Sequence, residues 1–159
     1  MLFRSLFETN YFGAVNSAAA AMPHLAERGG TLIFTGSIAG DMPSPVMGAY
    51  SASKHALHGF VQSLAIELRA ARSPVQVTLI KPSGVATPIA EHAANHRPGA
   101  ARIPPPVYDP GLVADAILHA ATHKVRARTV GGIGRLETLA AYALPGLRSE
   151  EHTSELQSH

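Results

Sequence analysis

A phenol and an ammonium group lie four residues apart in the stretch GAYSASKHALHGF, which covers residues 48–60 and is otherwise largely apolar. Residues four apart on a helix share one face, so Tyr50 and Lys54 should be neighbours there. Helical steps onward from this pair reach Leu57, Val61, Leu64 and Leu68. The pair therefore heads a stripe that should pack against a core, where an unpaired charge is costly. Either the helix starts at the edge of the core and Lys54 reaches water, or the pair has a chemical role.

Further polar side chains follow two apolar runs that are typical of buried strands. Ser37 ends the run TLIFTGS, and the segment KPSGVATP overlaps the end of the run VQVTLIKP. In open parallel sheets, ligands bind beyond the carboxyl ends of the strands. Asn10 is the polar member of another apolar helical stripe. We therefore expect a hydroxyl, a phenol, an ammonium and an amide to gather at one pocket.

Helices and strands are expected to alternate along the chain. Hydrophobic periodicity predicts helices over residues 2–27, 47–72, 89–95, 111–123 and 135–145. Short apolar runs predict strands over residues 31–37, 75–82 and 125–132. This alternation predicts the α/β class, as a partial Rossmann-like, doubly wound parallel sheet of about three strands with flanking helices. The Pro- and Gly-rich segment 92–108 is expected to be a flap over the substrate.

Taken together, these residues resemble the short-chain dehydrogenase/reductase family. Tyr50 follows Ser37 by thirteen positions, Lys54 completes a YxxxK spacing, and Asn10 lies in ETNYFGAV. KPSGVATP is similar to the Pro-Gly-x-x-x-Thr segment of that family, and the resemblance covers about residues 1–135. It implies a catalytic set of Asn10, Ser37, Tyr50 and Lys54. It also implies that NAD or NADP is bound by Tyr50, Lys54, Pro82, Ser83, Gly84, Val85 and Thr87.

The implied reaction interconverts a small-molecule alcohol and a carbonyl compound by hydride transfer. A free phenol has a pKa of about 10, and a nearby positive charge favours the phenolate. Tyr50 would therefore exchange a proton with the substrate oxygen beside the charge of Lys54, while Ser37 stabilises that oxygen. The resemblance further implies that Lys54 holds the nicotinamide ribose. It implies that Asn10 positions a water that feeds protons to Lys54.

Each of these residues also has a plainer interpretation. Tyr50 could be an aromatic residue at a helix end, and Lys54 could extend its ammonium group to water at the surface. Ser37 could be an ordinary turn residue at the end of a strand. Asn10 could be a buried amide bonded to backbone, and Thr87 could cap the short helix that follows it. The joint spacing of the residues favours the catalytic interpretation.

The sequence departs from the family pattern in two places. Ser83 stands where the family usually has Gly, beside the Val85 backbone and the Thr87 side chain that would contact the nicotinamide carboxamide. The family's TGxxxGxG phosphate loop and Asn-Asn-Ala-Gly strand are absent from the sequence. The segment GGIG, residues 131–134, lacks the spacing of such a loop and is predicted to be a turn. Residues 1–147 are thus expected to be the C-terminal portion of one Rossmann-like domain.

The last twelve residues, RSEEHTSELQSH at 148–159, share no pattern with the rest and match the translation of a common sequencing adapter. They are expected to be non-native, the alternative being a polar disordered tail. The resemblance implies a homo-oligomer that forms through helices 2–27 and 47–72. The alternative function is a catalytically incompetent fragment or a dimerisation module. We expect the isolated chain to bind neither NAD nor NADP tightly, because the phosphate-binding helix N-terminus would be missing.

Composition argues against several other classes of protein. The net charge is only +2 and the basic residues are scattered, so a nucleic-acid partner is not expected. No run is long and apolar enough to span a bilayer, so no membrane partner is expected either. The absence of cysteine excludes disulfides and thiolate metal sites and fits a cytoplasmic location. The pairs His92/His96 and His119/His123 lack a third ligand, so no metal site is predicted.

Overall fold

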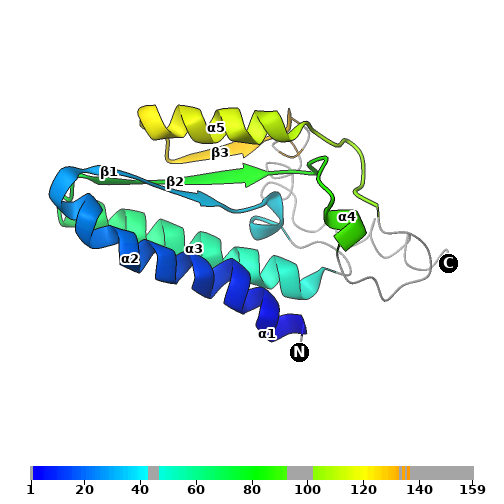
Figure 1. Ribbon diagram of the computed structural model, residues 1–159, viewed down its shortest axis with the longest axis horizontal. Helices are drawn as coiled ribbons and strands as arrows, with labels where there is room; N and C mark the ends of the chain where they lie inside the picture. Colours follow the sequence, from blue (N-terminus) through cyan, green and yellow to red (C-terminus); the bar gives the residue numbers. More distant parts are fainter. Residues whose placement is uncertain (1, 43–46, 93–101, 133, 135, 137–159) are drawn as a thin grey trace.

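Three parallel strands form the centre of the protein in the computed structural model (Figure 1). The structure describes residues 2–42, 47–92, 102–132, 134 and 136. The strands lie in the order β1 (Gly30–Thr35), β2 (Val75–Pro82), β3 (Ala127–Val130). Thr35 is paired with Ile80, and Pro82 is paired with Val130. All three carboxyl ends therefore lie at one edge of the sheet.

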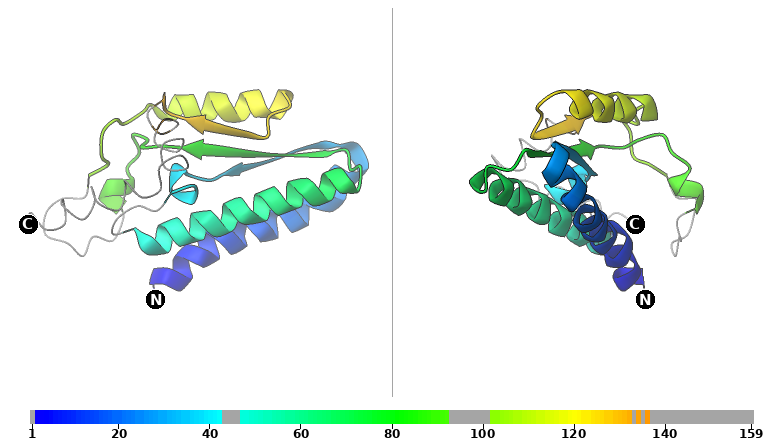
Figure 2. Two further views of the ribbon diagram at one scale, coloured as in Figure 1. Left: turned by 180° about the vertical axis from the view of Figure 1, so that it is seen from behind. Right: turned by 60° about the vertical axis from the view of Figure 1, so that its left-hand side comes forward.

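Helices cover both faces of this sheet (Figures 1 and 2). One face carries α1 (Leu2–Phe7), the π-helical segment η1 (Glu8–Phe12), α2 (Gly13–Arg28) and α3 (Gly48–Ala70). The opposite face carries α5 (Pro110–Thr122). Two short elements lie beyond the carboxyl ends of the strands: the 3₁₀ turn η2 (Ile38–Gly40) and α4 (Ile89–His92). The predicted α/β class, with a parallel sheet between helical layers, is confirmed.

Successive side chains of each strand point to opposite faces and so enter two separate apolar cores. The core beneath α2 and α3 contains Ala18, Leu32, Phe34, Leu57, Val61, Val77 and Leu79. The core beneath α5 contains Ile33, Ile80, Val113, Ala116, Ala120 and Val130. Because β1 and β2 are covered on both faces, apolar residues point to both sides of each strand, as Leu32, Ile33 and Phe34 do in β1.

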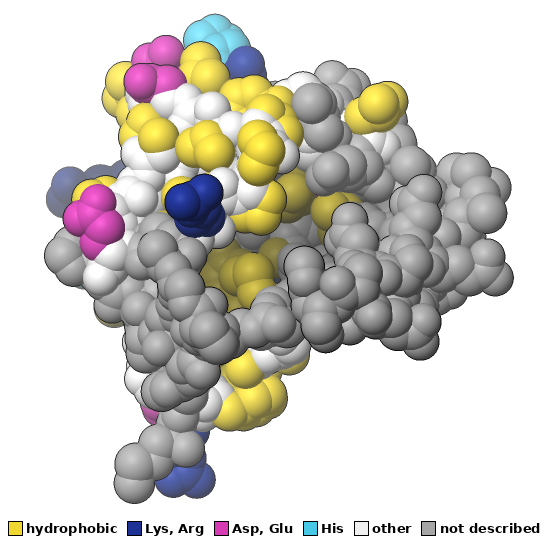
Figure 3. All heavy atoms as spheres, turned by 90° about the vertical axis from the view of Figure 1, so that its right-hand side faces the viewer, with side chains coloured by type: hydrophobic (Ala, Val, Ile, Leu, Met, Phe, Trp, Pro, Cys, Tyr) yellow, Lys and Arg dark blue, Asp and Glu magenta, His cyan; other side chains and the backbone are white. Residues whose placement is uncertain are grey.

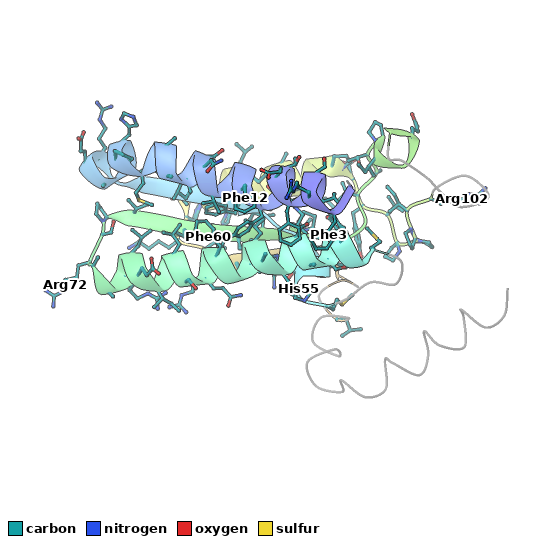
Figure 4. All side chains as sticks on the ribbon, turned by 90° about the horizontal axis from the view of Figure 1, so that it is seen from below. Phe3, Phe12, His55, Phe60, Arg72 and Arg102 are labelled. Carbon is teal, nitrogen blue, oxygen red and sulfur yellow. The ribbon has the colours of Figure 1, made fainter. Side chains whose placement is uncertain are left out.

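Aromatic rings fasten the N-terminal helices to α3. The ring centroid of Tyr11 lies 6.2 Å from that of Phe60, which lies 6.1 Å from Phe34 on β1. Both pairs meet edge to face, the arrangement that aromatic quadrupoles favour. Figure 4 shows Phe3, Phe12 and Phe60 along the seam between the two long helices. These contacts hold the segment that carries Asn10 against α3.

Two elements near the candidate site differ from the prediction. The helix predicted over residues 2–27 contains a π-helical turn, in which the N–H of Gly13 bonds to the carbonyl of Glu8, five residues earlier. The segment after Ser37, predicted as a loop, contains the turn η2. This turn forms because the Ser37 side chain accepts a hydrogen bond from the Ala39 N–H at 3.1 Å.

The prediction that GGIG forms a turn is only partly right. Gly131 ends β3 with a φ of 107°, but Gly132, Gly134 and Leu136 are already helical. A Cβ at Gly131 would overlap Ser83 Oγ, and a Cβ at Gly134 would lie 2.8 Å from Ser83 Cβ. Close packing against Ser83 therefore explains these glycines. The remainder of the predicted helix 135–145, the tail 148–159 and residues 93–101 of the predicted flap lie outside the described residues.

Candidate functional site

The end of β1, the end of β2, the turn η2 and the first turns of α3 meet at the carboxyl edge of the sheet (Figure 1). α3 packs against both η2 and β2, which brings residues from separate parts of the sequence together. Figure 3 faces this edge and shows apolar side chains in its hollowed part. Ligands of open parallel sheets bind at such an edge.

Lys54 is half-buried at this edge instead of extending into water. Its Nζ donates a hydrogen bond to the carbonyl oxygen of Thr35, the last residue of β1, at 3.1 Å. The same nitrogen lies 5.8 Å from the centroid of the Tyr50 ring. Burial lowers the pKa of Lys54 from its ordinary value, because an ammonium group loses hydration there. The ammonium thus connects the end of β1 to the turn of α3 that bears the phenol.

Ser37 lies two residues beyond β1 and is buried. Its backbone is extended, with a φ of −168°, and its Oγ accepts the hydrogen bond from Ala39 that caps η2. Its own N–H donates to Nε2 of His58 at 3.4 Å. A hydroxyl that accepts one hydrogen bond still carries a hydrogen that it can donate. Ser37 can therefore donate to an oxygen atom while both its backbone and its side chain are held.

Asn10 lies in the π-helical turn and reaches α3 through a second hydroxyl. Its Nδ2 donates to Oγ of Ser53 at 3.1 Å, and that Oγ donates to the carbonyl of Tyr50 at 2.7 Å. Ser53 is fully buried, whereas Asn10 is partly exposed. π-helical turns are frequent at functional sites because they displace a side chain from the regular helical position. Here the turn places the Asn10 amide against Ser53, in the second turn of α3.

The segment after β2 is tied to its neighbours mainly through backbone groups. Ser83 donates to the carbonyl of Val130 from its N–H at 3.0 Å and from its Oγ at 3.1 Å. Tyr108 donates its N–H to the carbonyl of Gly84 at 2.8 Å and accepts the N–H of Ala86 at 2.9 Å. The end of the predicted flap is therefore anchored to the segment that contains Pro82, Ser83, Gly84, Val85 and Thr87. Of these five, Thr87 is exposed.

Three further residues that shape the site were not predicted from the sequence. The carboxylate of Asp41 accepts two hydrogen bonds. Oδ1 accepts from His58 Nδ1 at 3.1 Å, and Oδ2 accepts from Lys81 Nζ at 2.6 Å. Burial by itself would raise the pKa of Asp41, but the hydrogen bonds from His58 and Lys81 and the charge of Lys81 outweigh it and lower the pKa. Only His58 had a usable signal, because it lies four residues after Lys54 on the predicted helix.

The remaining expectations concern metals and membranes. Within residues 2–42, 47–92 and 102–132, no group of three His, Asp or Glu side chains could hold a metal ion. The rings of His119 and His123 stack on one another with centroids 4.0 Å apart. Within the same part of the chain, no helix combines the length and apolarity needed to cross a bilayer.

The chain is similar in sequence to a known protein family and to several of its members. The family model described as short chain dehydrogenase matches residues 1–98. The chain is 36% identical over 149 residues to the uncharacterized oxidoreductase YxnA of Bacillus subtilis. It is 35% identical over 97 residues to (-)-trans-carveol dehydrogenase of Rhodococcus erythropolis. The chain spans 41% of the first relative and 34% of the second, which is less than half the length of either.

Solved structures show the same relationship. A short-chain dehydrogenase from Burkholderia cenocepacia, in complex with NADP, matches 96% of this chain and 58% of its own, with 26% identity and a TM-score of 0.76. Acetoin dehydrogenase YohF from Salmonella typhimurium matches 85% of this chain and 56% of its own, with 26% identity and a TM-score of 0.63. With the family model matching more than half of its residues, the chain belongs to the short-chain dehydrogenase family.

Proposed function

We propose that the protein that contains this chain is a nicotinamide-dependent oxidoreductase that interconverts a small-molecule alcohol and its carbonyl compound. The observation that carries this proposal is the position of the Lys54 ammonium, 3.1 Å from the Thr35 carbonyl and 5.8 Å from the Tyr50 ring. Burial of an ammonium group is costly unless it is hydrogen-bonded, and the Thr35 carbonyl supplies that bond at the end of β1. The proposed catalytic residues are Asn10, Ser37, Tyr50 and Lys54.

Tyr50 is proposed to exchange a proton with the substrate oxygen. A positive charge close to a phenol favours the phenolate, which is the form that can accept a proton near neutral pH. Lys54 supplies that charge from the same helical face. Ser37 would donate its hydroxyl hydrogen to the same substrate oxygen and stabilise the negative charge that develops there. Asn10, bonded to Ser53, is proposed to position the water that feeds protons to Lys54.

NAD or NADP is proposed as the cofactor, and its nicotinamide ring supplies or accepts the hydride. The chemistry of the donors at this edge fits such a group. An ammonium group has three N–H donors, and the Lys54 bond to Thr35 uses one of them, so others can bind ribose hydroxyls. The exposed Thr87 side chain and the nearby Val85 backbone offer hydrogen bonds to a carboxamide. The proposed cofactor-binding residues are Tyr50, Lys54, Pro82, Ser83, Gly84, Val85 and Thr87.

Replacing Tyr50 by Phe in the whole protein tests the proton-transfer role. We expect kcat to fall by about 10²–10⁴-fold, which is the usual contribution of a positioned acid or base. Tyr11→Phe is the matched control, since it removes the same hydroxyl from an aromatic ring in the core and should retain turnover. Turnover of the Tyr50→Phe variant within a few fold of the control would remove Tyr50 from this role.

Self-association through the α1–α2 and α3 layer is proposed as well. This layer exposes large apolar side chains, with Phe3 57%, Phe12 44% and Ile66 64% exposed. Apolar groups of this size on one helical layer are typical of surfaces that another protein covers. Light scattering on the whole protein should give a multiple of the chain mass, and Phe12→Glu should lower that mass. A wild-type protein that is monomeric at micromolar concentration would refute the proposal.

A further inference from the structure

A largely buried cluster of ionisable side chains lies next to Ser37, with 17% of the Lys81 side chain and 6% of the Asp41 side chain exposed. His58 on α3 is 2% exposed and lies 3.1 Å from Asp41, which lies 2.6 Å from Lys81 on β2. The N–H of Ser37 donates to the other ring nitrogen of His58 at 3.4 Å. None of these three side chains belongs to the proposed proton-transfer set. They connect the end of β1, the turn η2, the helix α3 and the end of β2.

The hydrogen bonds fix the form of the His58 ring. Nε2 receives an N–H from Ser37, so this nitrogen must present a lone pair and carry no proton. Nδ1 faces the Oδ1 of Asp41, and a carboxylate can only accept, so Nδ1 must carry the proton. His58 is therefore the neutral imidazole protonated on Nδ1. The second oxygen of Asp41 is bound to Lys81, which keeps the carboxylate charged and in place.

The backbone around Ser37 is shaped to this ring. A Cβ at Gly36 would overlap Nε2 of His58, and a Cβ at Gly40 would lie 2.5 Å from Cε1 and 2.7 Å from Nδ1. The segment from Gly36 to Gly40 thus curves around the imidazole, and at Gly36 and Gly40 there is room only for the hydrogen atoms of glycine. The position of the Ser37 hydroxyl depends on where this ring sits.

We propose that His58 is a positioning residue for Ser37. Its neutral ring, held by Asp41, accepts a hydrogen bond from the Ser37 N–H and so fixes the position of the Ser37 hydroxyl at the end of β1. Asp41 extends the same connection to Lys81, the residue before Pro82, so the Ser37 segment and the proposed nicotinamide-binding segment share one buried anchor. This inference rests on the proposed oxidoreductase function.

The first test is the kinetics of His58 variants in the whole protein. His58→Leu fills the buried space with an apolar side chain and removes both hydrogen bonds, so we expect kcat to fall on the order of 100-fold, as for a displaced reacting group, with KM nearly unchanged. His58→Gln retains an acceptor and a donor and should recover most of the lost kcat. His55→Leu is the matched control, because His55 is an exposed histidine on the same helix (Figure 4) and should leave kcat unchanged.

The second test reads the ring directly and needs no turnover. Long-range ¹H–¹⁵N spectra of the wild-type protein at neutral pH should show His58 with a proton on Nδ1 and none on Nε2. A ring protonated on Nε2 would overturn the proposal, and so would a kcat in His58→Leu equal to that of the control. If His58→Leu does not fold, the spectrum alone decides. If the wild-type protein turns over neither alcohols nor carbonyl compounds with NAD or NADP while the His58 ring has the expected form, the proposed function fails and the His58 geometry stands.

Discussion

A methyl group at Gly40 is expected to destabilise the protein through a single collision. A Cβ at this position would lie 2.5, 2.6 and 2.7 Å from three atoms of the His58 ring, far inside ordinary contact distance. The ring cannot move aside easily, because it is 2% exposed and hydrogen-bonded to Ser37 and Asp41. Gly40 is not among the positive-φ glycines, so backbone strain does not contribute. Overpacking of this kind should lower the free energy of unfolding by about 1–3 kcal/mol.

Gly59→Ala provides the matched control for this change. Gly59 lies inside α3, and a Cβ there would meet no atom within 4 Å. Alanine in place of glycine within a helix should therefore raise the free energy of unfolding by roughly 0.5–1 kcal/mol. The same chemical change should thus have opposite signs at the two positions, with a difference of roughly 1.5–4 kcal/mol. Urea unfolding of the whole protein measures both values, provided that the m-values agree.

Two results would refute this reasoning. The first is a Gly40→Ala variant that is as stable as Gly59→Ala. The second comes from repeating Gly40→Ala in a His58→Ala background, where the collision partner is gone and the added methyl should cost much less. An equal cost in both backgrounds would show that the His58 ring is not the source of the effect.

Three other outcomes are expected. The folded pKa of Asp41 is lowered, so Asp41→Asn should reduce the free energy of unfolding at pH values above the unfolded pKa of 3.8. The difference from wild type should shrink as pH falls below 3.8. Urea unfolding at several pH values measures this difference, and a constant difference would contradict the prediction. Lys54 should titrate below the ordinary pKa of 10.5 in an NMR titration. Its burial should therefore cost stability fully at low pH, and this cost should fall as pH rises through the lowered pKa and be absent above 10.5. A pKa at or above 10.5 would contradict the burial. Asp109→Ala should lower the free energy of unfolding by about 1 kcal/mol, because the Asp109 side chain is the N-cap of α5 and accepts the N–H of Gly111 at 2.6 Å. Asp109→Ser can still cap the helix and should retain most of this stability, and equal thermal midpoints for the two variants would exclude the cap.

Local patterns were sufficient for the regular elements. The strand predicted over residues 75–82 is β2 without change, and the helix predicted over 47–72 is α3 to within two residues at each end. Both depend on periodicity and on end signals that lie within the element itself. The YxxxK spacing placed Tyr50 and Lys54 on one helical face for the same reason. The sheet could also be predicted as parallel, because helices alternate with strands along the chain.

Departures from regular geometry could not be predicted in this way. The π-helical turn at Glu8–Phe12 adds one residue to a helical turn, and its sequence is compatible with an ordinary α-helix. The glycines of GGIG predicted a turn, whereas Gly131 and Gly134 are required by the close approach of Ser83, which lies far earlier in the sequence.

The sequence by itself determined the regular helices and strands, their alternation along the chain and the set of polar groups near the strand ends. These depend on local hydrogen bonding and on which side chains avoid water. Only the tertiary structure decided that Asp41, His58 and Lys81 form one buried cluster behind Ser37. A charged side chain looks like a surface residue in sequence, and its burial becomes favourable only when chain segments far apart in sequence supply its partners.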